Sequence, residues 1–190
     1  LRGQGIDVVN LSVGEPDGDP PAAAIEAAQA ALTRGENKYA PLAGLPELRS
    51  AIAQWNCDQH GLDVSAENVL VTMGGKQALY NVAVALFGPG DEVITHSPGW
   101  PSIVEQVHLA GAEPVLVRTS AEERFELRAE AILDAVTPRT RGIVINSPGN
   151  PTGALMSEPE LARLADGIAA RDIWVILDLC YEQLIYDDTP

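Results

Sequence analysis

Basic side chains are scarce in this sequence. Its 190 residues contain 12 Lys and Arg against 27 Asp and Glu, which gives a formal net charge of −15. This negative balance argues against a protein that binds nucleic acid, because the release of counterions from phosphates requires basic contacts. Only two of the basic residues are lysines, Lys38 and Lys76.

Cysteine and long apolar runs are also limited. Cys57 and Cys180 lie far apart without a CxxC spacing, so neither a disulfide framework nor a metal site is indicated, and a reducing, cytoplasmic setting is the default. No run approaches the roughly 18 to 20 apolar residues of a membrane-spanning helix, and we expect no membrane contact. Apolar residues make up 46% of the chain, which is typical of a globular protein.

Short apolar runs rich in β-branched residues predict buried strands. Because the runs are continuous rather than alternating, they are typical of a parallel sheet covered on both faces. Their starts lie roughly 22 to 30 residues apart, close to the length of a βαβ repeat. The runs are Val69–Met73, Val93–Thr95, Val115–Val117, Ile143–Ile145 and Ile173–Leu177.

Helical spacing fills segments before and between these runs. Ser157 followed by Glu160 has the pattern of a capping box. We therefore predict an α/β fold, a mostly parallel sheet with helices on both faces, preceded by a short N-terminal segment. In such sheets ligands bind beyond the carboxyl ends of the strands. The expected helices include Pro21–Leu32, Pro46–Trp55, Ala78–Leu86 and Leu161–Ile168.

Two predicted strand ends carry groups suited to a phosphate and a flat ring. Gly74 and Gly75 follow the first strand and open a helix, where exposed N–H groups and the helix dipole favour an anion. A turn with purely steric glycines is the alternative interpretation. Trp100 lies between two prolines after the second strand, where its ring can stack on a ligand or cover the core.

Two further strand ends supply an amide, a carboxylate and a phenol. Asn150 lies in a rigid turn and precedes Pro151, where a cis bond is expected. Asp178 ends the fifth strand, and Tyr181 follows it. A structural salt bridge would satisfy the Asp178 carboxylate, and so would a protonated ring nitrogen. The combined set is what pyridoxal 5′-phosphate requires.

The chain also resembles the class I, aspartate aminotransferase-like group of fold type I pyridoxal-phosphate enzymes, in its prokaryotic-type subgroup. The similarity runs in the family's order over nearly the whole chain. Two departures are Gly18, where an aromatic residue is usual, and Leu179-Cys180, where the family has Glu-(Ile/Val). The motifs are Gly14–Asp17, Lys38–Pro41, Ala43–Arg49, Gly74–Leu79, Asn150–Gly153, and Asp178 with Tyr181.

The resemblance assigns roles around the cofactor phosphate. The backbone of Gly75 and Lys76 would hold the phosphate, and Trp100 would stack on the pyridine ring. Tyr39 would reach the phosphate of the neighbouring subunit, which implies a homodimer with shared active sites. The family also makes Ser97–Pro98 a candidate cis bond.

The resemblance assigns roles around the ring and the substrate as well. Asn150 and Tyr181 would hydrogen-bond the ring oxygen, and Asp178 would pair with the pyridinium nitrogen and keep it protonated. Gly14 would lie against the substrate carboxylate, with Trp100 and Asn150 as further substrate contacts. No residue is assigned to a metal.

The implied function is ping-pong transfer of an amino group between an amino acid and a 2-oxo acid, as in amino-acid biosynthesis. We expect residues 1–20 to contribute to the substrate pocket or small domain and residues 21–190 to form an incomplete large domain. The Schiff-base lysine and the carboxylate-binding arginine are expected after Pro190. Another pyridoxal-phosphate reaction, such as that of a lyase or decarboxylase, stays open, as does a non-catalytic sensor module of a transcription regulator, although the charge of −15 opposes contact with DNA.

A polypeptide of these 190 residues alone is expected to have no transaminase activity. Its motifs prepare a binding site for the cofactor, but neither of its lysines falls in the motif of the catalytic one. The measurement is amino-acid-dependent amine transfer with added pyridoxal phosphate. Turnover of any amino-acid donor would contradict the prediction.

Overall fold

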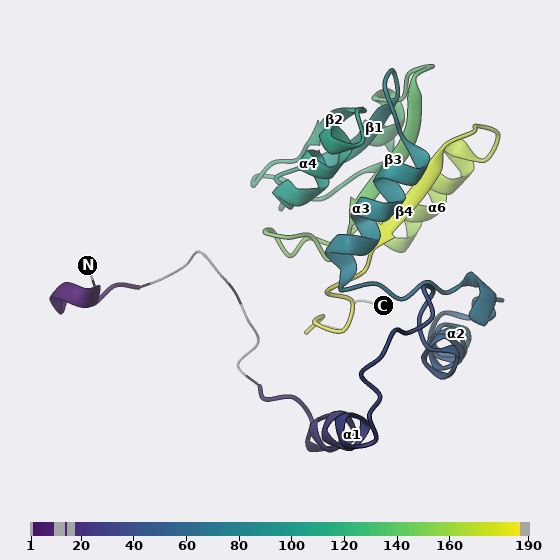
Figure 1. Cartoon of the computed structure of the whole chain (residues 1–190). Helices are drawn as coiled ribbons and strands as arrows, with labels where there is room; N and C mark the ends of the chain where they lie inside the picture. Colours follow the sequence, from purple (N-terminus) through teal and green to yellow (C-terminus); the bar gives the residue numbers. More distant parts are fainter. Residues whose placement is uncertain (1, 10–13, 15–17, 187–190) are drawn as a thin grey trace. The chain divides into compact units, whose positions relative to one another are not determined.

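The computed structural model describes residues 2–9, 14 and 18–186. The chain divides into two compact units, Leu1–Leu42 and Ala43–Pro190, which we term the N-terminal unit and the sheet unit (Figure 1). The division after residue 20 that the sequence suggests stays a prediction. In the part of the chain that is described, no helix is long and apolar enough to cross a membrane.

The N-terminal unit contains the helix predicted there. After a 3₁₀ turn, η1 (Arg2–Gln4), helix α1 spans Ala22–Thr33. Its alanine-rich sequence has high helix propensity. The helix ends just before Gly35, whose φ of +79° suits a glycine at this position. None of the residues of α1 is buried.

The sheet unit is built on four parallel strands in the order β2-β1-β3-β4. Each forms at one of the apolar runs, which confirms the parallel sheet expected from the sequence. Continuous β-branched runs suit the central strands β1 and β3, which are buried on both faces, whereas most side chains of β2 and β4 are exposed or half-buried. The strands are β1 (Glu92–Ser97), β2 (Glu113–Arg118), β3 (Thr140–Asn146) and β4 (Trp174–Asp178).

Helices cover both faces of the sheet, as predicted. Side chains of α3 and α4 pack on one face, and those of α5 and α6 pack on the other. The bounds are α2 (Pro46–His60), η2 (Ala66–Asn68), α3 (Gly75–Leu86), α4 (Pro101–Leu109), α5 (Ala129–Asp134) and α6 (Glu158–Ile168).

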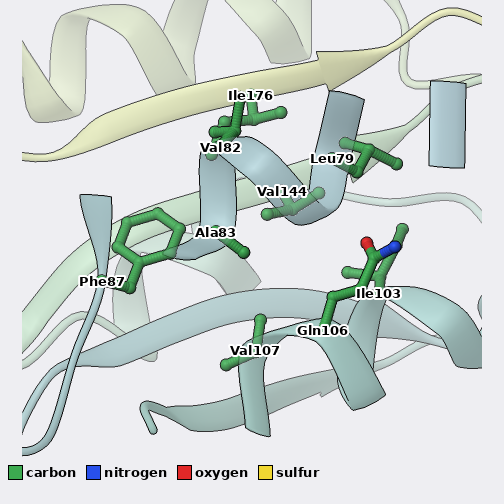
Figure 2. A pocket seen from close by; sticks show the side chains of 9 residues that line it. All are labelled: Leu79, Val82, Ala83, Phe87, Ile103, Gln106, Val107, Val144 and Ile176. Atoms are coloured by element: carbon green, nitrogen blue, oxygen red, sulfur yellow. The ribbon is translucent and has the colours of Figure 1, made fainter. Parts of the chain in front are cut away.

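Successive side chains of the central strand β3 enter opposite layers. Ile143 and Ile145 belong to the cluster formed with α5 and α6, whereas Val144 packs against α3 and α4. All three are at most 5% exposed. Figure 2 shows Val144 among side chains of α3 and α4. The alternation follows from the two-residue period of a strand.

The strand predicted at Val69–Met73 is wrong. This segment belongs to no ladder of the described residues and runs directly into α3. Its backbone link is a hydrogen bond from Val71 N to the carbonyl of Ala43, 2.9 Å long. Apolar, β-branched sequence supplies the propensity for a strand, but a strand also needs a neighbour to pair with, and propensity does not specify one.

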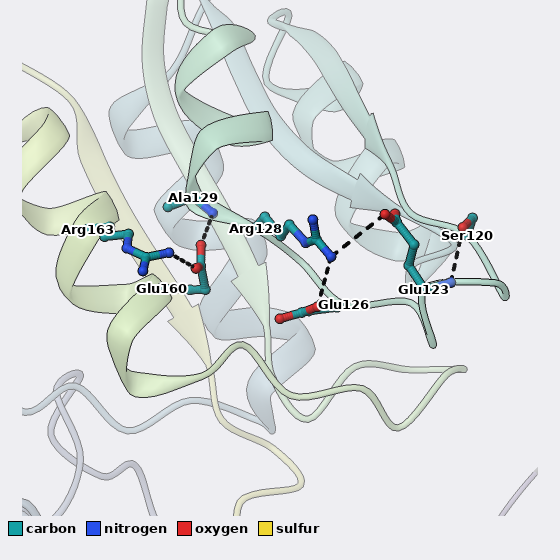
Figure 3. A network of polar contacts seen from close by, with 7 residues as sticks. All are labelled: Ser120, Glu123, Glu126, Arg128, Ala129, Glu160 and Arg163. Carbon is teal, nitrogen blue, oxygen red and sulfur yellow. Dashed lines mark hydrogen bonds and ion pairs between the residues drawn. The ribbon is translucent and has the colours of Figure 1, made fainter.

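The capping box predicted at Ser157 is also wrong. Ser157 is the N-cap of α6, but its side chain makes no capping bond. The Glu160 carboxylate turns away and accepts a hydrogen bond from Ala129 N, the first residue of α5, at 2.7 Å. It also pairs with Arg163 (Figure 3). Glu160 therefore ties α6 to the N-terminus of α5, where a negative charge is favourable.

Replacing Glu160 with alanine is expected to destabilise the full-length protein by about 1–3 kcal/mol, because it leaves the buried Ala129 N–H without an acceptor. Urea unfolding measures the loss. Glu158→Ala is the matched control, since Glu158 lies exposed in the same helical turn and should change stability by less than about 0.5 kcal/mol. Equal midpoints for the two variants would refute the role of Glu160.

Candidate active site

The candidate site lies at the carboxyl ends of the parallel strands, where ligands of α/β sheets bind. The last paired residues of β3 and β4 are Asn146 and Asp178, which face each other in register. Beyond them, Ser147 N and Asn146 Nδ2 donate to the backbone carbonyl of Asp178 at 3.2 and 3.3 Å. The end of β4 is thus fixed by β3 and by the loop that follows it.

Asp178 presents a half-buried carboxylate at this edge. One of its oxygens, Oδ1, accepts a hydrogen bond from Cys180 N at 3.2 Å. Among the described residues, no Lys, Arg or His forms an ion pair with this carboxylate. The structural salt bridge considered as an alternative is therefore not present among the described residues.

Asn150 and Tyr181, predicted to act together, are brought together by the fold. Asn150 Nδ2 donates to the phenol oxygen of Tyr181 at 3.2 Å. The backbone N–H of Asn150 donates to Asn146 Oδ1 at 2.8 Å, which anchors the turn to the end of β3. The predicted cis bonds Ser97–Pro98 and Asn150–Pro151 are present, and Ser147–Pro148 is a third that the sequence did not indicate.

The N-terminus of α3 carries the two glycines that the sequence analysis assigns to a phosphate. Gly74 precedes the helix with a φ of +80°, a conformation that disfavours other residues. A Cβ at Gly75 would meet nothing within 4 Å, so the first turn of α3 is open. Lys76 Nζ lies 5.1 Å from the centroid of the Trp100 ring, and Trp100 is the N-cap of α4.

Gln106 is a supporting residue that the sequence reasoning missed. It is 7% exposed and lies in α4 among apolar side chains (Figure 2). Its Nε2 donates to the carbonyl of Lys76 in the first turn of α3 at 2.9 Å. The signal in the sequence was a lone amide between the apolar residues Ile103 and Val107.

Gly14 and Tyr39 belong to the N-terminal unit. Gly14 is exposed, and the Tyr39 side chain is fully exposed. The remainder of the Gly14–Asp17 motif, residues 15–17, lies outside the described residues. The roles that the resemblance assigns to Gly14 and Tyr39 stay predictions.

The donor set of the sheet unit fits pyridoxal phosphate. An open helix N-terminus suits a phosphate, and the free side of a carboxylate suits a protonated ring nitrogen. The hydrogen-bonded amide and phenol suit a ring oxygen. Within residues 2–9, 14 and 18–186, no group of three or more His, Cys, Asp or Glu side chains could hold a metal ion.

Sequence comparison relates the chain to a known family of enzymes. Residues 6–190 match the model of the family described as aminotransferase class I and II. The chain is 47% identical over 187 residues to a probable aspartate/prephenate aminotransferase of Thermus aquaticus, covering 98% of the chain and 49% of the relative. It is 40% identical over 186 residues to an aspartate aminotransferase of Geobacillus stearothermophilus, covering 98% and 47%.

Solved structures of aminotransferases are also similar to this chain. A double mutant of Thermus thermophilus aspartate aminotransferase superimposes with a TM-score of 0.95 at 47% identity, covering 98% of this chain and 49% of that one. The aspartate aminotransferase of Rhizobium meliloti gives 0.93 at 39% identity, covering 98% and 47%. The chain spans about half the length of the curated relatives it matches. It belongs to the class I and II aminotransferase family.

Proposed function

We propose that the protein containing this chain catalyses pyridoxal-phosphate-dependent transfer of an amino group between an amino acid and a 2-oxo acid. The observation that carries the proposal is the convergence of Asp178, Asn150 and Tyr181 at one edge of the sheet, where Asn150 already donates to the Tyr181 phenol. Since the chain spans about half of its relatives, the activity is proposed for the whole protein.

Three side chains of the sheet unit would hold the cofactor ring. Asp178 would keep a proton on the ring nitrogen, since a carboxylate beside it favours the charged form. Asn150 Nδ2 and the Tyr181 hydroxyl would each donate a hydrogen bond to the ring oxygen, while Asn150 Nδ2 keeps its bond to the Tyr181 phenol oxygen. When bound, the cofactor supplies an electron-withdrawing ring that stabilises negative charge at the substrate α-carbon.

The first turn of α3 would hold the phosphate. The backbone N–H groups of Gly75 and Lys76 point out of a helix N-terminus, which carries the positive end of the dipole. Trp100 would stack on the ring from the N-terminus of α4 and exclude water from that face. These residues bind and orient; the proton at the substrate α-carbon requires a lysine from the remainder of the protein.

We also propose the finer assignments that the resemblance implies. Gly14 would contact the substrate carboxylate, together with Trp100 and Asn150, and Tyr39 would reach the phosphate of a second subunit in a homodimer. Residues 1–20 would then contribute to the substrate pocket, and residues 21–190 to the large domain. A cytoplasmic, biosynthetic setting is consistent with two free cysteines.

The proposed donor is aspartate. Relatives from Thermus aquaticus and Geobacillus stearothermophilus carry aspartate in their names, and the first is also named for prephenate. The test is amine transfer by the full-length protein from aspartate to 2-oxoglutarate or prephenate, with release of ammonia and carbon dioxide followed in parallel. Transfer without release supports the proposal; release without transfer refutes it in favour of a lyase or decarboxylase.

Asp178→Asn in the full-length protein is expected to lower the transfer rate by about 100-fold or more, since a neutral amide does not hold the ring nitrogen protonated. Asp178→Glu should restore part of the rate. The control is Asp166→Asn, an exposed aspartate on α6 that should leave the rate unchanged. A rate for Asp178→Asn close to that of the control would contradict the assignment.

Gln106→Leu is expected to weaken binding of pyridoxal phosphate by up to about tenfold, because the carbonyl of Lys76 loses its donor and the first turn of α3 loosens. Titration of the full-length protein with the cofactor measures this. Gln54→Leu, an exposed glutamine on α2, serves as the control. Unchanged affinity in Gln106→Leu would show that the contact does not support the phosphate site.

A further inference from the structure

His96 is a buried polar side chain that the proposed cofactor contacts leave unexplained. It lies near the carboxyl end of β1 and is 8% exposed. Its neighbours include Leu127 and Met156, so the ring points to the face covered by α5 and α6. It is therefore on the opposite side of the sheet from α3 and α4.

One ring nitrogen of His96 holds the loop that carries Trp100. His96 Nδ1 lies 3.1 Å from the carbonyl oxygen of Pro98. Because a carbonyl only accepts, Nδ1 carries the proton and donates it. A Cβ at Gly99 would come within 2.4 Å of the backbone oxygen of His96, so the loop lies tightly against the end of β1.

The other ring nitrogen, Nε2, is then an acceptor in the neutral ring. It is buried and has no hydrogen-bond partner among residues 2–9, 14 and 18–186. A buried acceptor without a donor is costly, and native proteins rarely leave one.

His96 lines a small cavity with mixed walls, in which Asn146, Ser147 and Thr152 supply further polar groups among apolar side chains. The cavity offers about 10 Å³ to the centre of a water molecule, close to the roughly 10–15 Å³ that one water needs. Ser147 Oγ accepts from Met156 N at 3.0 Å, and Thr152 Oγ1 accepts from Ala154 N at 3.3 Å. Each hydroxyl therefore keeps its own proton for donation into the cavity.

We propose that one water molecule binds in this cavity, donates to His96 Nε2 and accepts from the hydroxyl of Ser147 or Thr152. His96 is thereby a positioning residue with two links. Nδ1 holds the Trp100 loop directly, and Nε2, through the water, holds the turn from Ser147 to Thr152 that contains Asn150. The positioning role rests on the proposed function, whereas the water site depends on the fold alone.

A high-resolution crystal structure of the full-length protein tests the water site. The expected result is a water oxygen within about 2.7–3.2 Å of His96 Nε2 and of the Ser147 or Thr152 oxygen. A dry cavity, or a direct bond from Nε2 to a protein group, would overturn the proposal. This result does not depend on whether the protein binds pyridoxal phosphate.

Three variants of the full-length protein test the positioning role. The amide of His96→Asn can replace Nδ1, and the amide of His96→Gln can replace Nε2, so each keeps one link. We expect the dissociation constant for pyridoxal phosphate to rise about threefold in each and about tenfold in His96→Leu, which keeps neither. The visible circular dichroism of the bound cofactor should fall in the same order.

His108→Leu is the matched control, because His108 is exposed in the last turn of α4. If His96→Leu binds pyridoxal phosphate with the same affinity and gives the same visible dichroism as this control, the positioning role is refuted. If His96→Leu does not fold, unchanged affinity and dichroism in both His96→Asn and His96→Gln would likewise refute the positioning role. Failure of the unaltered protein to bind the cofactor would instead refute the proposed function.

Discussion

The candidate site depends on the register between β3 and β4. Asn146 stands opposite Asp178, and two donors from the β3 end hold the carbonyl of Asp178 one step beyond the ladder. A slip of one residue would turn the Asp178 carboxylate to the other face of the sheet. It would also separate Asn150 from Tyr181, because Asn150 is tied to Asn146 and Tyr181 follows β4. Backbone pairing thus sets the geometry of the site.

The groups assigned to the cofactor and the groups that support them differ in burial. Asp178 and Trp100 are half-buried, while Gln106 and His96 are 7% and 8% exposed. Gln106 donates to the carbonyl of Lys76 and His96 to that of Pro98, two positions before Trp100. Hydrogen bonds away from water resist exchange with solvent, so they hold loops more rigidly than surface contacts do. The supports come from different faces of the sheet, Gln106 from one and His96 from the other.

Sequence patterns predicted the layers of the fold, and they singled out Asn150 and Tyr181, which the fold brings into contact. They did not predict the backbone contacts that support these elements. Continuous apolar runs specified four strands, of which β1 and β3 are buried on both faces, as that composition predicts. The same composition at Val69–Met73 gave no strand, since pairing depends on a neighbour that local sequence does not describe. Ser157 and Glu160 have capping-box spacing, but Glu160 reaches Ala129, 31 positions earlier in the chain. Gln106 and His96 were missed as supports for the same reason: their partners are carbonyl groups, which no side-chain pattern reveals.

The link between Glu160 and Ala129 has a consequence for the order of folding. Helix α5 has six residues, about half the length at which an isolated helix becomes even marginally stable in water. Its first N–H is satisfied by a carboxylate that belongs to α6. A helix this short persists only once its neighbour is in place. Helix α5 therefore takes the acceptor for its N-terminal N–H from a part of the chain that is synthesised later, and this contact can be complete only after α6 has been made.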